Sequence, residues 1–137
     1  MDGNSIASLG ELLTFAGNSE RGLELVERAK KLNPNYPGWY WYINFYRAYS
    51  QRDYENALNF ALKVNMPGHW AAAMMIAAAS GQLGQREAAD KAVRDVLKLR
   101  PDVASTVRSD MTKWWSPEDV EHFIDGLRKA GLEIVDE

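Results

Sequence analysis

Three proline-marked corners divide the chain into units of nearly equal length, and this spacing limits the fold more than any other feature. Pro34, Pro67 and Pro101 belong to the strings KKLNPN, KVNMPG and LKLRPD, and they stand 33 and then 34 residues apart. Ahead of each proline lies a break, at FAGNSE, YSQRDYE and GQLGQRE, where one helix would turn into the next. A repeat of helix, turn, helix and corner predicts stacked helical hairpins.

The residues between these corners favour helices. Ala, Leu, Glu, Lys and Arg fill most of the chain, and the prolines stand at segment edges, where a missing amide donor costs least. After each break, Gly22, Ala57 and Ala89 are small residues where two helices must approach closely. No convincing alternation of apolar and polar residues indicates a strand. We therefore expect an all-α protein with short connections.

This pattern resembles the tetratricopeptide repeat (TPR) family, which has bulky, small and proline residues at fixed positions of its unit. The resemblance covers about three quarters of the chain, as units 3–36, 38–69 and 70–103. The matching residues are Ile6, Leu9, Gly10, Leu13, Gly22, Val26, Ala29 and Pro34, then Trp41, Tyr54 and Ala57, then Ile76, Ala77, Ala89, Val93, Val96 and Pro101. Asn44 and Phe45 depart from the family's usual leucine and small residue, and Pro67 comes early. The resemblance implies a right-handed α-α superhelix of three hairpins.

Beyond Asp102 the repeat stops, and residues 103–137 are predicted to form a helix pair that caps the solenoid within the same domain. One short helix is expected over 103–114. Ser116 as N-cap and Pro117 at the first helical position then announce a helix that runs to Ala130 and ends at Gly131. The strings YPGWYWY, NMPG and DGLRKAGL resemble the C-terminal TPR tails of bacterial proteins that carry class III nucleotide cyclase or other signalling domains. That resemblance implies a regulatory tail of a larger signalling enzyme.

The string GWYWYINFYRAY, residues 38–49, holds seven of the chain's aromatic side chains. On an α-helix, Trp41, Phe45 and Ala48 share a face that would pack on the second helix of the unit. An adjacent face would line the concave groove that the resemblance implies, and Met74, Met75 and Ala78 would extend it. The predicted partner-binding residues are therefore Trp39, Tyr42, Tyr46, Tyr49, Met74, Met75 and Ala78. Such a groove suits an amphipathic helix or an extended apolar peptide, and the alternative is that most of the rings fill a core.

The TPR groove that holds acidic chaperone tails needs Lys, Arg and Asn at fixed positions of the first helices. The corresponding residues here are Ala7, Glu11, Ile43, Ala71 and Met75. We therefore expect no binding of an acidic chaperone tail.

Catalysis by this chain alone is not expected. The chain has no cysteine, and its two histidines, His69 and His122, have no partner at metal-ligand spacing. We expect His69 at the corner after Pro67 and His122 on the exposed side of the last helix. No glycine-rich phosphate loop is present, so the sequence indicates no metal, no cofactor and no enzyme.

The charge balance argues against nucleic acid and membrane partners. The formal net charge is −3 and the pI is about 5.4, which gives no basic field for phosphates. No apolar run approaches the roughly 20 residues that a bilayer requires, and the N-terminus lacks a signal sequence, so a cytoplasmic location is the default. The basic residues of the second helices, balanced by acids, are expected on a solvated face: Arg28, Lys30, Lys31, Lys91, Arg94 and Lys98.

The sequence therefore favours a non-catalytic module that binds a partner protein or peptide. Self-association is an alternative, through Leu12, Leu13 or Phe15, or through Trp114 and Trp115, which would give a homodimer. A small hydrophobic ligand in the groove is a further alternative.

Overall fold

A computed structural model of the chain describes residues 2–66, 68–113 and 115–134, and all regular structure in these ranges is helical. The predicted all-α class is thereby confirmed, while Pro67 and Trp114 lie outside the described residues. The elements are α1 (Gly3–Phe15), α2 (Ser19–Leu32), the 3-10 turn η1 (Gly38–Trp41), α3 (Tyr42–Ser50), α4 (Tyr54–Val64), α5 (Trp70–Leu83), α6 (Arg86–Leu99), α7 (Val103–Met111) and α8 (Pro117–Lys129).

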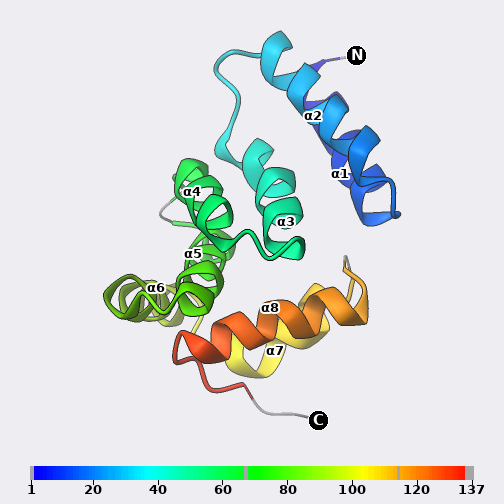
Figure 1. The fold of residues 1–137 in the computed structure, drawn as a ribbon. Coiled ribbons are helices and arrows are strands. Elements are labelled where there is room, and N and C mark those ends of the chain that lie inside the picture. Colours follow the sequence, from blue (N-terminus) through cyan, green and yellow to red (C-terminus); the bar gives the residue numbers. More distant parts are fainter. Residues whose placement is uncertain (1, 67, 114, 135–137) are drawn as a thin grey trace.

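The first six helices pack as consecutive pairs, α1 with α2, α3 with α4 and α5 with α6 (Figure 1). The small residues expected at these crossings are buried in all three pairs. In the first pair, a Cβ on Gly10 would lie 2.6 Å from the carbonyl oxygen of Gly22, so the two helices approach as closely as only glycine allows. The pairs are consistent with the helical hairpins that the sequence predicts.

The last two helices are arranged differently, because α8 packs mainly on α5 and makes few contacts with α7. In Figure 1, α8 passes beneath α3 and ends beside the third hairpin. Its ends follow the sequence signals: the Ser116 hydroxyl accepts the amide of Asp119, Pro117 is the first residue, and Gly131 has a φ of 107°. The predicted N-cap and terminal glycine are therefore confirmed, although the helix ends at Lys129.

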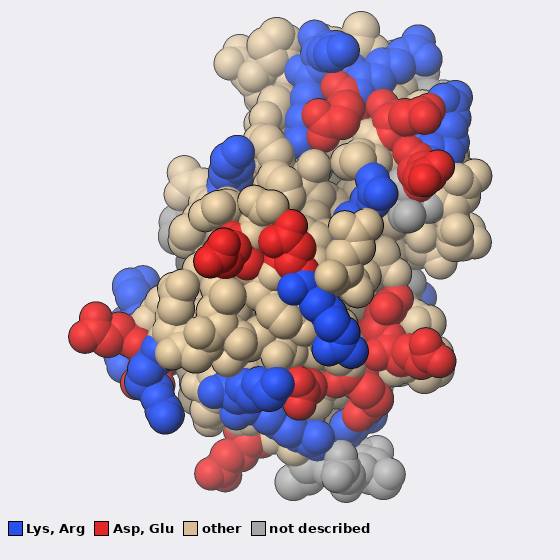
Figure 2. Space-filling view, viewed as in Figure 1, with Lys and Arg blue, Asp and Glu red and all other residues tan. Residues whose placement is uncertain are grey.

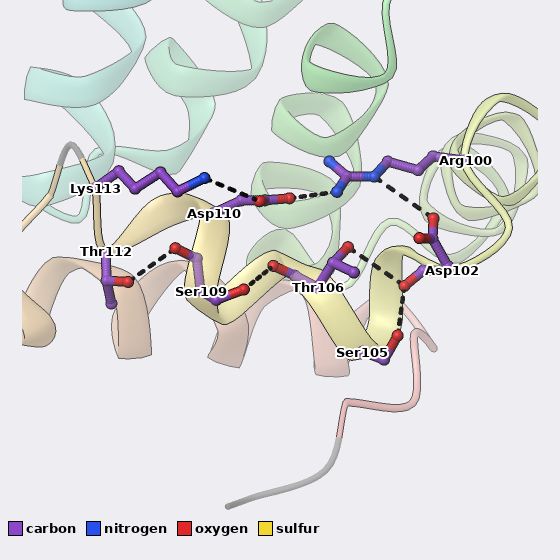
Figure 3. Close-up of polar contacts among 8 residues, drawn as sticks. All are labelled: Arg100, Asp102, Ser105, Thr106, Ser109, Asp110, Thr112 and Lys113. Carbon is purple, nitrogen blue, oxygen red and sulfur yellow. Dashed lines mark hydrogen bonds and ion pairs between the residues drawn. The ribbon is translucent and has the colours of Figure 1, made fainter.

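The guanidinium of Arg100 holds α7 against the end of α6 (Figure 3). It pairs with the carboxylate of Asp110 on α7 and lies 3.6 Å from that of Asp102. Its central carbon also lies 4.3 Å from the ring centroid of Trp70 on α5. One cation therefore links three helices.

The described apolar residues form two buried clusters. The smaller cluster belongs to the first hairpin, with Tyr40 and Ile43 inserted from η1 and α3. The larger cluster runs from α3 to the residues after α8. The first hairpin is thus joined to the remainder mainly through the aromatic segment.

Acidic and basic side chains are interspersed on the face shown in Figure 2, and neither sign forms a continuous patch there. Lys30 is an exception to the expected solvated face, because its side chain is only 8% exposed. Its ammonium group lies 3.4 Å from the ring centroid of Trp41 and donates to Glu27 and Asn44. Among the described helices, none is both long and apolar enough to cross a bilayer.

Candidate functional site

The aromatic segment starts as a 3-10 turn, and this changes the direction of its first rings. Residues 38–41 form η1, so the α-helical face assumed from the sequence begins only at Tyr42. Tyr40 turns into the first hairpin, where its hydroxyl donates to the side-chain oxygen of Asn4. Trp41 lies between the hairpins and stacks on Phe60 of α4 at a centroid distance of 5.8 Å. These rings fill the space between neighbouring helix pairs.

The helical face expected to pack on the second helix of the unit does so. Phe45 and Ala48 are buried in the larger cluster together with Ala57 and Ala61 of α4. This part of the core was predictable from helical spacing alone.

Four of the seven predicted partner-binding residues are buried: Tyr49, Met74, Met75 and Ala78, with exposures of 3%, 1%, 7% and 0%. The open groove expected at these positions is absent, because all four side chains are buried. Trp39, Tyr42, Tyr46 and Tyr49 are called the aromatic face below, and α8 covers Tyr49 of this face and Ala78 of α5. The Tyr49 hydroxyl donates to the carbonyl oxygen of His122 at 2.8 Å. Gly126 of α8 lies directly against the backbone of Ala78.

The covering face of α8 is fully buried. Val120, Phe123, Ile124 and Leu127 are each at most 1% exposed. Burial of one such side chain contributes about 1.5–3 kcal/mol, so removal of the helix would cost on the order of 10 kcal/mol. A free energy of about 10 kcal/mol is as large as the whole binding free energy of a complex with a dissociation constant between nanomolar and micromolar. A partner that displaced α8 would therefore spend its entire binding free energy on doing so. We therefore treat α8 as part of the core.

The other three predicted partner-binding residues, Trp39, Tyr42 and Tyr46, are half-buried. The rings of Tyr46 and Phe15 pack edge-to-face at a centroid distance of 5.5 Å, and the Tyr46 hydroxyl donates to Asp119 of α8. Burial first, and then Asp119, raise the pKa of Tyr46 to about 12. Tyr46 is therefore protonated at neutral pH and serves as a donor.

Tyr42 shares its surroundings with Glu11 of α1. Burial raises the pKa of Glu11 to about 7, and the nearby Glu11 charge adds to the burial that raises the pKa of Tyr42. Glu11 is thus a half-buried carboxyl group on the side of α1 that faces α3.

His122 does not lie on the exposed side of α8 as expected. Its ring lies 4.4 Å from that of Tyr49, centroid to centroid, and its Nε2 shares a hydrogen bond of 2.7 Å with the Tyr54 hydroxyl. Burial first, and then the positive charge of Arg52, lower its pKa. The helical pattern gave the wrong prediction here because Tyr49 and Tyr54 of the second hairpin cover a polar position of α8.

A small polar cleft of about 280 Å³ opens beside the turn between α1 and α2. It is lined by Thr14, Gly17, Tyr46, Arg47, Ser50, Gln51 and Asp119. The lining contains no histidine or cysteine, and in the described ranges no three His, Cys, Asp or Glu side chains gather as a metal site would require. The cleft offers hydrogen bonds but no pair of nucleophile and base.

A larger groove of about 380 Å³ lies between α4, α5 and α6, and its lining is mainly apolar. Five of its twelve lining residues are alanines, and Leu62 on one side is 56% exposed. The lining residues are Ala61, Leu62, Asn65, Met66, His69, Ala72, Ala73, Ile76, Ala88, Lys91, Ala92 and Asp95. This groove was not predicted from the sequence. The signal for it was the alanines on successive helices, Ala72 and Ala73 on α5 and Ala88 and Ala92 on α6.

The sequence matches no protein-family model and no curated protein. A proposal for the function therefore rests on the residues and contacts described above.

Proposed function

We propose that the chain is a non-catalytic module of three TPR-like hairpins, stacked as a short superhelix, that binds an apolar segment of a partner protein. The hairpin pairs and the spacing of the three corners support the repeat assignment. The groove between α4, α5 and α6 carries the binding proposal, because it is the larger of the two clefts described and the more apolar.

The shape of this groove suits a helix with one large apolar side chain. Ala73, Ala88 and Ala92 have side chains of a single carbon, so a partner's backbone can approach their helices closely. Leu62 then gives the partner an exposed apolar side chain to cover. Recognition of an amphipathic helix in a groove works through such contacts.

The charges at the groove favour a partner that is uncharged at its centre. The ammonium group of Lys91 lies 2.9 Å from a carboxylate oxygen of Asp95, so these two charges already satisfy each other. Asn65 and His69 add polar groups along the lining. A partner charge placed on the alanines would lose water without gaining an opposite charge.

The aromatic face is the second candidate surface, reduced to Trp39, Tyr42 and Tyr46. Its remaining part already receives an amphipathic helix from within the chain, namely α8. This makes the aromatic face a weaker site for a partner than the open groove.

The test uses a displayed library of helical peptides selected on the full chain, followed by mapping of backbone amide chemical shifts. We expect apolar amphipathic peptides whose binding shifts Leu62, Ala73 and Ile76. Leu62→Glu should weaken binding at least tenfold, and the matched variant Leu12→Glu should leave it unchanged, since both leucines are exposed. Shifts confined to Trp39, Tyr42 and Tyr46, or equal effects of both variants, would contradict the proposed site.

A further inference from the structure

The polar cleft beside the turn between α1 and α2 is built from three segments that lie far apart in the sequence. Its lining comes from the end of α1 with the turn after it, from the second half of α3 with Gln51, and from the first turn of α8. These segments come together at the right of Figure 1. The cleft therefore depends on the packing of the first hairpin and α8 around α3.

Arg47 brings to the cleft a positive charge that no described acidic side chain balances. Three arginines of the described ranges are partly buried, namely Arg47, Arg100 and Arg108. Arg100 pairs with Asp110, and Arg108 pairs with Glu121. The guanidinium group of Arg47 has no ion pair and no hydrogen bond with any described residue. Its N–H donors are therefore available to a ligand in the cleft.

Asp119 brings a negative charge to the same cleft. Its carboxylate accepts the hydroxyl of Tyr46 and forms no ion pair with a cation of the described ranges. The Tyr46 ring is itself held between the rings of Phe15, at a centroid distance of 5.5 Å, and Trp115, at 5.3 Å. The carboxylate therefore has a fixed position, and it keeps acceptor sites for a second donor.

The two charges do not satisfy each other, although they line one small cleft. No ion pair joins Arg47 and Asp119, both of which are described. A cation in the cleft would be attracted by Asp119 and repelled by Arg47, and an anion would meet the reverse. A ligand that carries both charges would find an opposite charge for each of them. The arrangement therefore favours a zwitterion over a simple anion or cation.

The volume of the cleft and its uncharged lining restrict the zwitterion further. The volume of about 280 Å³ lies at the lower limit of small-molecule sites, which begin at roughly 300 Å³. Thr14 is 2% exposed and its hydroxyl donates to the carbonyl oxygen of Gly10, so it can only accept from a ligand. Ser50 and Gln51 add a hydroxyl and an amide. The side chain of the ligand should therefore be short and polar.

We propose that this cleft binds a free α-amino acid with a short polar side chain. The carboxylate of the amino acid pairs with the guanidinium group of Arg47, and its ammonium group donates to Asp119. Its side chain lies among the hydroxyl and amide groups of the cleft. The bound amino acid bridges α3 and α8, so it also stabilises the folded chain.

The first test uses L-serine as the probe, with two analogues that each lack one of its charges. Ethanolamine lacks the carboxylate, and 3-hydroxypropionate lacks the ammonium group. Titration of the full chain to about 50 mM, followed by backbone amide chemical shifts, covers the millimolar affinity expected of so small a ligand. L-serine should shift Arg47, Ser50 and Gln51 saturably, with a dissociation constant at least tenfold below that of either analogue. No saturable shift in the cleft, or an analogue that binds as tightly as L-serine, would overturn the proposal.

The second test changes each charge of the cleft in turn. Arg47→Gln should weaken L-serine binding at least tenfold, and Arg47→Lys should weaken it less because the charge remains. Asp119→Asn should also weaken it at least tenfold, although asparagine can still accept the Tyr46 hydroxyl. The matched control is Arg94→Gln, at an exposed arginine of α6 outside the cleft, which should bind as the native chain does.

Unchanged binding by Arg47→Gln or Asp119→Asn, or an equal loss in Arg94→Gln, would contradict the site. Apolar peptides selected on the α4–α6 groove should bind all of these variants alike, because that groove contains neither Arg47 nor Asp119. The proposed function and this inference can therefore fail separately.

Discussion

The hydroxyl of Tyr54 lies 2.7 Å from Nε2 of His122, which joins the second hairpin to a helix 68 residues further along the chain. Around this pair, Tyr49 contacts the His122 ring and Phe123 packs on Tyr49. The last helix is therefore bound to the aromatic segment by both polar and apolar contacts.

The position of His122 predicts a loss of stability on acidification. Its pKa is lowered from 6.5 in the folded chain, so the folded state disfavours the proton. The contribution of the neutral imidazole to the free energy of unfolding is complete above pH 6.5. It is lost as the pH falls below 6.5 toward the pKa of the folded chain. Urea unfolding from about pH 7 to about pH 5 isolates this effect as a difference, because Glu11 titrates alike in both proteins: the free energy of unfolding of the native chain should fall relative to that of His122→Gln. Identical pH slopes would contradict the arrangement.

Glu11 predicts the opposite change at higher pH. Its pKa is raised from 4.5 to about 7, so the folded state favours the protonated carboxyl group. The contribution of the protonated carboxyl group to the free energy of unfolding is complete below about pH 4.5 and is lost as the pH rises through about 7. Glu11→Gln should therefore stabilise the chain at about pH 9 by up to roughly 3 kcal/mol and have little effect at about pH 4.5. Equal stability of the two proteins at the higher pH would show that Glu11 is solvated.

The crossing of α8 over α5 predicts that Gly126 tolerates no side chain. A Cβ there would lie 2.7 Å from the carbonyl oxygen of Ala78 and would overlap the Tyr49 hydroxyl. Gly126→Ala should destabilise the chain by about 2 kcal/mol, despite the higher helix propensity of alanine. Gly68→Ala is the matched control, because its Cβ meets nothing within 4 Å. Thermal melts in which both variants behave alike would refute the close crossing.

The sequence predicted the helices well because local signals determine them. The breaks, the small residues Gly22, Ala57 and Ala89, and the caps at Ser116 and Gly131 all lie where the structure has helix ends and crossings. Helical spacing likewise placed Phe45 and Ala48 in the core. These features depend on neighbours a few residues away, or on the partner helix of the same hairpin.

The aromatic face could not be judged from the sequence because its environment is set by a distant segment. Tyr49 would face a groove if the chain ended after the third hairpin, and it is buried because α8 crosses it. The 3-10 turn at Gly38–Trp41 also redirects Tyr40 and Trp41 away from the face that an α-helix would give them. Lys30 is buried for a related reason, since Trp41 and Asn44 surround its ammonium group.

The most direct test is hydrogen exchange of the native chain, measured along α3 and α8. If α8 is part of the core, the amides of Tyr42–Ser50 and Pro117–Lys129 should open together, with a free energy close to that of global unfolding. Protection of α3 that persists while α8 exchanges rapidly would show that α8 detaches and leaves the aromatic face open.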